Sequence, residues 1–128
     1  VVVIIGILAA IAIPNFIAMQ DRAKEGSTKA NMHTFQLAAE DYSVQNDASY
    51  AADVSGVTPL LPRGGATFLN PFNKTVAAWL DAGAWAVPLT TGSTIAGIVA
   101  YQDSVQQKYQ LAARGKSGEL TLVLTSGQ

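Results

Sequence analysis

The residues that could carry out chemistry are few and far apart in this chain of 128 residues. His33 is the only histidine and there is no cysteine, so no cluster of nitrogen and sulfur ligands can gather around a metal ion. Glu40 and Asp41 are adjacent, and adjacent side chains on a helix point about 100° apart, which is unsuitable for a catalytic carboxylate pair. No serine lies in a G-x-S-x-G sequence. We therefore expect no enzymatic activity, no bound metal and no cofactor.

Two further patterns have ordinary explanations. Asn73-Lys74-Thr75 matches the acceptor sequence for N-glycosylation and lies in a predicted loop, but three-residue patterns arise often by chance. Asn73 is therefore a minor candidate for modification. Lys108, Arg114 and Lys116 gather near the C-terminus of a chain whose net charge is −1, which is typical of a solvated face. We predict no specific binding of nucleic acid.

The element that dominates the chain is an apolar run at its start. Residues 1–13 are all aliphatic, alanine or glycine, and the first charged residue is Asp21. A membrane-spanning helix needs about 20 mostly apolar residues, and an entirely apolar helix needs lipid or other protein around it. No basic segment precedes the run and no small-residue cleavage site follows it, so it is unlike a secretory signal and we expect residues upstream. Gly6 and Pro14 weaken the helix, because proline has no N–H to donate and glycine costs about 1 kcal/mol relative to alanine.

The following segment, to about residue 47, is an amphipathic helix with two apolar stripes. The first has alternating spacings of four and three and comprises Thr28, Met32, Phe35, Ala39, Tyr42 and Asn46. The second, on a different face, comprises Ala30, Leu37 and Val44. Two stripes indicate two sets of neighbours, such as the chain's own head and another subunit, although the second could be ordinary exposed surface. A continuous helix of about 48 residues would be about 70 Å long, so it must protrude.

The remainder predicts a loop and a small antiparallel sheet. The loop, residues 48–75, is long enough to be packed on the surface, and the apolar residues expected to hold it are Leu60, Leu61, Phe68, Leu69 and Phe72. Four short strands are expected over residues 84–89, 94–101, 108–114 and 119–125. Alternation in the last strand indicates one buried and one wet face, and the buried face would pack on Met32, Phe35, Ala39 and Tyr42. The predicted fold class is α+β, with a hydrophobic helix (1–20) and a globular head (21–128) that includes a sheet over about 84–125.

The run VVVIIGILAAIAIPNF, residues 1–16, resembles the N-terminal signature of type IV pilins and of type II secretion pseudopilins. The spacing of Gly6 and Pro14 matches closely. Weaker similarities follow in Leu61-Pro62, in Asn70-Pro71-Phe72 and in the hairpin over 109–118. The family motif begins about eight residues earlier, with an N-methylated phenylalanine and then a glutamate, and no residue of this chain takes either role.

The resemblance implies a type IV pilin-like fold and a structural subunit. The precursor would sit in the inner membrane, in contact with lipid, and a prepilin peptidase and the inner-membrane assembly machinery would be its partners. Subunits would then polymerise with copies of themselves into an extracellular pilus, serving adhesion, motility or DNA uptake. The segment from Gly6 to Pro14 would lose helical structure on assembly. The predicted filament core comprises Val1, Val2, Val3, Ile4, Ile5, Ile7, Leu8, Ile11, Ile13 and Phe16.

Two alternatives remain open. A pseudopilin or minor pilin shares the helix, although many major pseudopilins carry an acidic calcium-binding loop near the C-terminus and residues 115–119 hold a single acid. A membrane-anchored binding protein would also need only one span and a sheet domain, but it would not explain the close match around Gly6 and Pro14.

Overall fold

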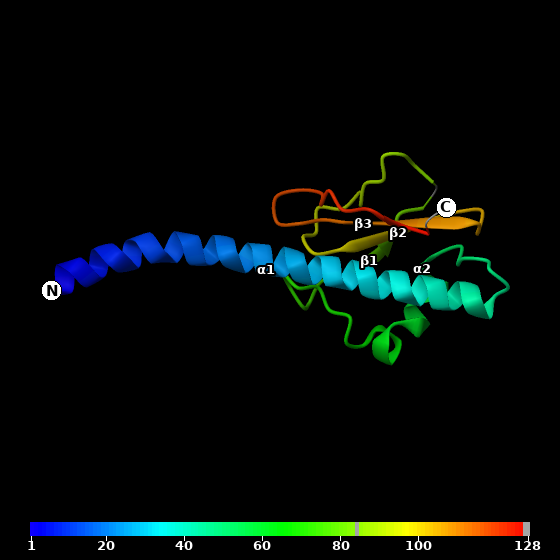
Figure 1. Cartoon of the computed structure of the whole chain (residues 1–128), viewed down its shortest axis with the longest axis horizontal. Coiled ribbons are helices and arrows are strands. Elements are labelled where there is room, and N and C mark those ends of the chain that lie inside the picture. Colours follow the sequence, from blue (N-terminus) through cyan, green and yellow to red (C-terminus); the bar gives the residue numbers. More distant parts are fainter. Residues whose placement is uncertain (84, 127–128) are drawn as a thin grey trace.

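The computed structural model describes residues 1–83 and 85–126 and shows a long helix with a small head on its C-terminal half (Figure 1). The helices are α1 (Val2–Gln45), α2 (Val54–Val57) and the short 3-10 helices η1 (Thr58–Leu60) and η2 (Pro62–Gly65). The strands are β1 (Trp79–Asp81), β2 (Val99–Ser104), β3 (Lys108–Ala113) and β4 (Leu124–Thr125). The predicted α+β class with a protruding N-terminal helix is confirmed.

Helix α1 runs without a break for 44 residues. At 1.5 Å per residue it is about 66 Å long, and the half that precedes the head extends beyond it (Figure 1). Pro14 lies inside the helix and does not end it. The helix ends at Gln45 because Asp47 and Ala48 take left-handed backbone angles (φ 53° and 66°) and the Ala48 N–H turns back to the Ser43 carbonyl.

The sheet has the order β1-β2-β3-β4. The pairs β2–β3 and β3–β4 are antiparallel, as predicted, whereas β1 pairs with β2 in parallel. The parallel pair arises because β1, which was not predicted, lies before the segment 82–98 and this segment crosses back to begin β2 beside it. The predicted all-antiparallel arrangement is therefore wrong at this edge.

The strand boundaries differ from the prediction in three places. Residues 85–89 of the expected strand 84–89 form a loop, and residue 84 lies outside the described residues. The expected strand 94–101 is displaced toward the C-terminus, because Gly97 is left-handed (φ 83°) and β2 begins only after it. The expected strand 119–125 is reduced to Leu124–Thr125, preceded by a single bridge between Arg114 and Glu119. The expected strand 108–114 agrees with β3 to within one residue.

The loop 85–90 covers the face of the sheet that the sequence predicted to be wet. The Ala86 N–H donates to Gln102 Oε1 (3.0 Å), and Gln110 Nε2 donates to the Ala86 carbonyl (2.8 Å) and to Gln102 Oε1 (2.7 Å). Both glutamines and the alanines beside them in β2 and β3 are buried. The prediction of one buried and one wet face is thus wrong for β2 and β3, because two buried glutamines provide the polar partners that the loop backbone needs.

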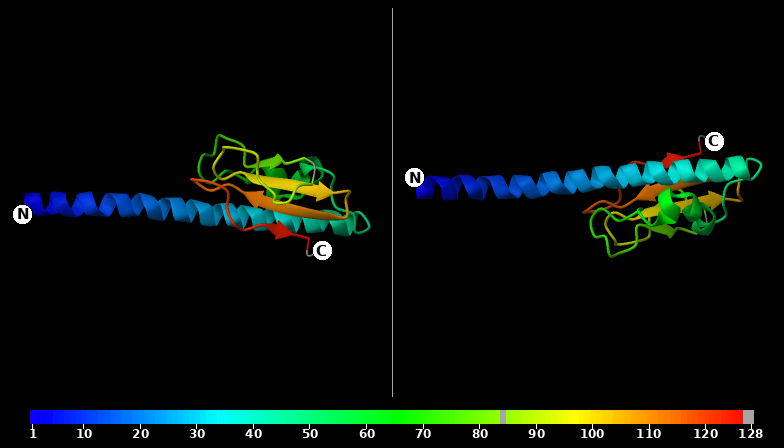
Figure 2. Two further views of the ribbon diagram at one scale, coloured as in Figure 1. Left: turned by 90° about the horizontal axis from the view of Figure 1, so that it is seen from above. Right: turned by 90° about the horizontal axis from the view of Figure 1, so that it is seen from below.

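The core lies between one face of α1 and the opposite face of the sheet, and the segment 50–68 closes it along the flank of the helix (Figures 1 and 2). Leu61 and Phe68 hold this segment in the core, as predicted, and Leu60 packs against the core while partly exposed. Leu69 does not, since 44% of it is exposed. The sheet and this segment bury one face of the C-terminal half of α1, and they leave the N-terminal half exposed.

Candidate assembly surface

The N-terminal half of α1, residues 1–20, has no contact with the rest of the chain that buries a side chain. The ten residues predicted as filament core (Val1, Val2, Val3, Ile4, Ile5, Ile7, Leu8, Ile11, Ile13 and Phe16) are each between 58% and 94% exposed. By length and composition, α1 is the one helix among the described residues that could cross a membrane. Single exposed apolar residues are ordinary on a protein surface, but a contiguous apolar cylinder marks a site of contact with lipid or protein.

Gly6 and Pro14 lie within this exposed half, and both are helical. Pro14 leaves the Ala10 carbonyl without the N–H that a helix normally supplies. Beside it, an open apolar hollow of about 440 Å³ is lined by Ala12, Ile13, Asn15, Phe16 and Met19. The space around Gly6 is also open, since nothing lies within 4 Å of the position that a Cβ would take.

The C-terminal half of α1 has its first stripe in the core. Met32, Phe35 and Ala39 are fully buried, and Tyr42 packs against the core while partly exposed. Thr28 is also buried, but Asn46 lies past the helix end and is exposed. The second stripe is exposed along its whole length, with Leu37 at 58% and Val44 at 83%.

A partly buried acid, Glu40, connects α1 to the sheet. Glu40 Oε1 accepts a hydrogen bond from the Tyr109 hydroxyl (2.7 Å), and Oε2 accepts one from the Tyr50 hydroxyl (3.2 Å). Tyr109 stacks on Tyr101, whose hydroxyl donates to the Ala51 carbonyl (2.7 Å). The local pattern around Glu40 could not indicate tyrosines 10 and 69 residues away.

Burial changes the chemistry of these tyrosines. Loss of hydration raises the pKa of Tyr101 and Tyr109 well above the ordinary value of 10.0, because it disfavours the charged phenolate. For the Tyr109 pKa, the hydrogen bond to Glu40 and the negative charge of Glu40 add to this effect. The pKa of Tyr50 is raised in the same way, by burial first and then by Glu40. All three hydroxyls therefore act as hydrogen-bond donors near neutral pH and hold the head together.

A second residue with an unexpected role is Asn70, which is fully buried. Its Nδ2 donates to the Ala77 and Ala96 carbonyls (2.9 and 2.8 Å), and its Oδ1 accepts from the backbone N–H of Phe72 (2.9 Å). Gly97 allows this approach: a Cβ there would lie 2.3 Å from Asn70 Oδ1. The sequence indicates Asn70 only through the Asn-Pro-Phe similarity, whereas in the structure its side chain joins two loops that are distant in sequence.

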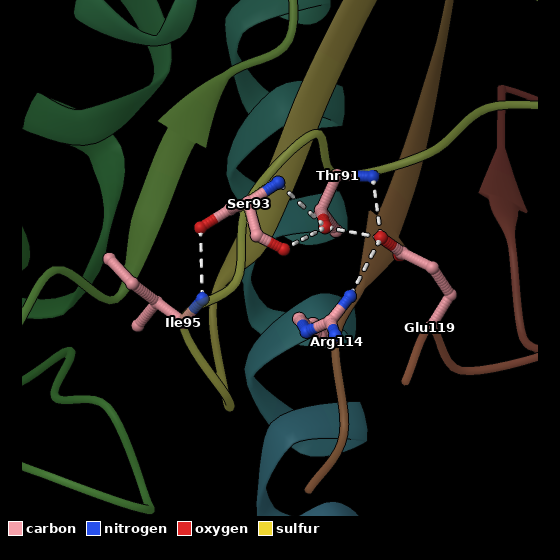
Figure 3. A network of polar contacts seen from close by, with 5 residues as sticks. All are labelled: Thr91, Ser93, Ile95, Arg114 and Glu119. Carbon is pink, nitrogen blue, oxygen red and sulfur yellow. Dashed lines mark hydrogen bonds and ion pairs between the residues drawn. The ribbon is translucent and has the colours of Figure 1, made fainter. Parts of the chain in front are cut away.

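A polar network joins the segment that follows β3, through Glu119, to Thr91 and Arg114 (Figure 3). Glu119 Oε1 accepts from the Thr91 N–H (3.1 Å) and hydroxyl, and it lies 3.7 Å from Arg114 in an ion pair. The Thr91 hydroxyl oxygen also accepts from the Ser93 N–H (3.4 Å). Of the three clustered cations, Arg114 therefore has an acidic partner and Lys108 lies 4.5 Å from the centre of the Trp85 ring.

The remaining candidates lie apart from one another on the surface. His33 is exposed, with its Nδ1 3.2 Å from Gln36 Oε1, and no group of three or more metal-binding side chains occurs in residues 1–83 and 85–126. Asn73 is exposed in a turn in which its Oδ1 accepts from the Thr75 N–H (3.0 Å) and hydroxyl (2.7 Å). Among the described residues, the longest run of exposed apolar side chains is the N-terminal half of α1.

Comparison with known proteins gives one informative match. The chain is 49% identical over 47 residues to the type IV major pilin protein PilA of Myxococcus xanthus, strain DK1622. The match covers 37% of this chain and 21% of the relative, so it spans about a fifth of the relative's length. No family model matches the chain, and no solved structure matches it. On its long apolar helix, its α+β head and this match, the chain resembles a type IV pilin.

Proposed function

We propose that this protein is a structural subunit that polymerises through the apolar half of α1 into an extracellular type IV pilus. The observation that carries the proposal is the contrast within one helix: residues 1–20 form a contiguous exposed apolar surface, and the rest is fixed in a folded head. The similarity to a major pilin supports the same function. Residues 1–20 and 21–128 are then two functional units, one for assembly and one for display.

The physical driving force for assembly depends on where the subunit begins. Removing a large apolar side chain from water contributes about 1.5–3 kcal/mol, but lipid tails are already apolar, so transfer from a membrane contributes much less. Before assembly, the subunit would lie in the inner membrane with lipid around residues 1–20. Helix packing alone would then supply a small gain, so assembly would need inner-membrane machinery, and a prepilin peptidase would process the precursor.

In the filament, the segment from Gly6 to Pro14 would lose helical structure. The unpaired Ala10 carbonyl beside Pro14 and the weak helix former at Gly6 make this the least stable part of α1. In lipid the freed backbone groups would lack partners, which favours the intact helix. Among packed copies of the chain the segment could extend, and extension would lengthen the subunit.

The test is mass spectrometry of filaments sheared from cells, with the wild-type chain compared to Ile7→Glu and to Val87→Glu. Both positions are exposed, at 58% and 77%, but only Ile7 lies in the apolar half. We expect the wild-type chain to dominate the sheared fraction, Ile7→Glu to be lost from it, and Val87→Glu to remain. A wild-type chain that stays with the inner membrane, with only traces outside, would overturn the proposal in favour of a pseudopilin, a minor pilin or an anchored binding protein.

A further inference from the structure

The end of the head that faces the apolar half of α1 carries an excess of positive charge. It holds two carboxylates, Asp21 and Glu25, together with five cations, whereas the rest of the chain has three cations and seven carboxylates. We call the five cations the basic collar; they are Arg22, Lys24, Lys29, Lys74 and Lys116. The chain is therefore polarised along α1, although its overall net charge is only −1.

Three separate segments bring the collar together at one level of α1. The turn after β3 lies against the helix, because the Lys116 backbone N–H donates to Glu25 Oε1 (3.3 Å). The loop that holds Lys74 reaches the same level, since Lys24 Nζ lies 5.8 Å from the centre of the Phe72 ring. In Figure 1 the orange-red connection after β3 and the green segment after η2 both extend toward the apolar half. Folding thus gathers cations that are far apart in the sequence.

The collar is not neutralised by the head itself. Within residues 1–83 and 85–126 none of its five cations forms an ion pair with a carboxylate, and the ion pair found there joins Arg114 to Glu119. Four of the five side chains are exposed, and Lys24 is half-buried. Glu25 already accepts a hydrogen bond from the Lys116 N–H. A cluster of exposed cations without acidic partners attracts an anionic ligand or surface.

The position of the collar along α1 indicates which anionic surface it meets. The stretch without charge ends at residue 20, so the edge of a hydrocarbon layer around the apolar half would lie near Asp21. Residues 21–25 rise about 7 Å along the helix, and the headgroup layer on each side of a bilayer is about 5–8 Å thick. Lys29 lies about 6 Å further along, and long basic side chains can reach back to the interface. The collar is thus at the depth of lipid headgroups.

The side of the membrane makes this placement unusual. Lysine and arginine generally gather on the cytoplasmic side of a membrane span. The proposed function puts the head outside the cytoplasm, so the five cations would lie on the opposite side. A favourable contact with lipid accounts for them there, because ammonium and guanidinium groups pair with phosphate. Each basic residue near an anionic membrane surface strengthens binding about fivefold.

We infer that the basic collar binds anionic phospholipid headgroups while the apolar half of α1 lies in lipid. The inference rests on the proposed function for the position of the apolar half. The contact adds an electrostatic attraction to the apolar anchor and fixes the depth at which the head sits. A subunit that enters a filament must first release it.

A fluorescent probe on the full chain in lipid vesicles tests the contact, because the chain has no native cysteine to compete for the label. Ser117→Cys places the probe beside Lys116, and Ser49→Cys places it at an exposed position past the far end of α1. The vesicles contain phosphatidylcholine with or without phosphatidylglycerol, and each carries the same small fraction of a lipid with a quenching nitroxide on its headgroup. Phosphatidylglycerol should increase the quenching at position 117. About 1 M NaCl should abolish the increase, since it shortens the screening length to about 3 Å.

Position 49 is the reference for distance. It follows the end of α1 at Gln45, which lies about 30 Å along the helix from Glu25. Quenching there should change with neither phosphatidylglycerol nor salt. An equal response at positions 49 and 117 would overturn the inference, because it would mean that the whole head, and not the collar, approaches the lipid.

Charge reversal separates the collar from the overall charge of the chain. Lys29→Glu with Lys74→Glu leaves three cations against four carboxylates at this end of the head. Phosphatidylglycerol should then lower the quenching at position 117, because like charges repel. The matched control is Arg63→Glu with Lys108→Glu, which changes the net charge equally but alters η2 and β3, outside the collar. The control should keep the wild-type response.

The remaining outcomes distinguish the collar from the proposed function. A wild-type chain that stays in the vesicles without responding to phosphatidylglycerol would overturn the collar contact alone, as would a response that the collar variant retains. Binding of duplex DNA that only the collar variant loses, without a lipid response, would assign the collar to nucleic acid instead. Extraction of the wild-type chain from vesicles by alkaline carbonate would overturn the lipid position of the apolar half, and the proposed function with it. Absence of sheared filaments from wild-type cells, with the lipid response intact, would overturn the proposed function alone.

Discussion

The two halves of α1 have the same backbone conformation and opposite relations to the rest of the chain. Residues 1–20 carry no charged side chain, and none of them is buried. Between Thr28 and Ser43 the helix instead buries six side chains in the head. Helical structure in the second half is stabilised by tertiary packing, as in most protein helices, whereas the first half has no packing within its own chain.

With the proposed function, stability and assembly would be distributed over separate parts of one helix. Changes in the buried half should act on unfolding of the head. Changes in the apolar half should act on transfer between lipid and filament and leave the head intact. Such separation would let the subunit of the proposed pilus leave the membrane while its head remains folded.

Two phenylalanines on the same helix give the largest contrast. Phe35 is fully buried and its ring contacts those of Phe68 and Tyr101, whereas Phe16 is 61% exposed. Phe35→Ala should destabilise the head by about 3–5 kcal/mol, because it removes a buried ring and leaves a cavity. Phe16→Ala should change head stability by less than about 0.5 kcal/mol and reduce filament yield. Chemical unfolding of both full-length variants in detergent micelles, followed by tyrosine and tryptophan fluorescence, measures the difference.

Equal destabilisation by the two substitutions would contradict the difference between the two halves of α1, because it would mean that the apolar half also stabilises the head. Phe35→Leu is the matched control for volume. It retains most of the buried apolar surface and should cost less than Phe35→Ala.

Much of this arrangement could be predicted from sequence, where the pattern is local and periodic. The length of α1, the apolar half and the burial of Met32 and Phe35 follow from composition and helical spacing. The prediction of strand β3 is correct to within one residue, because the turn residues 115–118 end it. Each of these features is determined by residues within a few positions of one another.

The parts that sequence did not predict depend on partners far away in the chain. The apolar residues at 85–89 look like a strand, but Gln102 and Gln110 capture the Ala86 backbone and hold the segment as a covering loop. Strand β1 is only three residues long and is defined by its pairing with β2. In the head, the tyrosine partners of Glu40 lie 10 and 69 residues away from it, so no local pattern indicated them.

A change of pH should act on the head alone, because residues 1–20 have no titratable side chain. Burial raises the pKa of Tyr101 and Tyr109 above 10.0, so the folded chain keeps protons that the unfolded chain loses above about pH 10. Their contribution is fully present below pH 10 and declines as pH rises, by about 1.4 kcal/mol per pH unit for each tyrosine. Chemical unfolding between pH 8 and 11.5 should show this decline, and the helix content of the apolar half should not follow it.

Tyr109→Phe provides the control for the alkaline decline. It removes one ionising group and one hydrogen bond to Glu40, so the variant should be less stable at neutral pH but should lose stability less steeply above pH 10. An unchanged slope in this variant would show that Tyr109 does not contribute to the decline.

The smallest effect concerns the network in Figure 3, which fixes the C-terminal connection without touching the apolar half. Thr91 is buried and donates from both its N–H and its hydroxyl to Glu119 Oε1, which also faces Arg114. Thr91→Val keeps the shape and the N–H bond but removes the hydroxyl, so it should cost about 1–2 kcal/mol of head stability. Thr91→Ser retains the hydroxyl and should cost less, which separates the hydrogen bond from packing. Hydrogen exchange should become faster at residues 115–120 in the valine variant, while residues 1–20 exchange as in the wild type. Faster exchange in the apolar half as well would mean that the two parts of the chain are coupled, and the separation of stability from assembly would then fail.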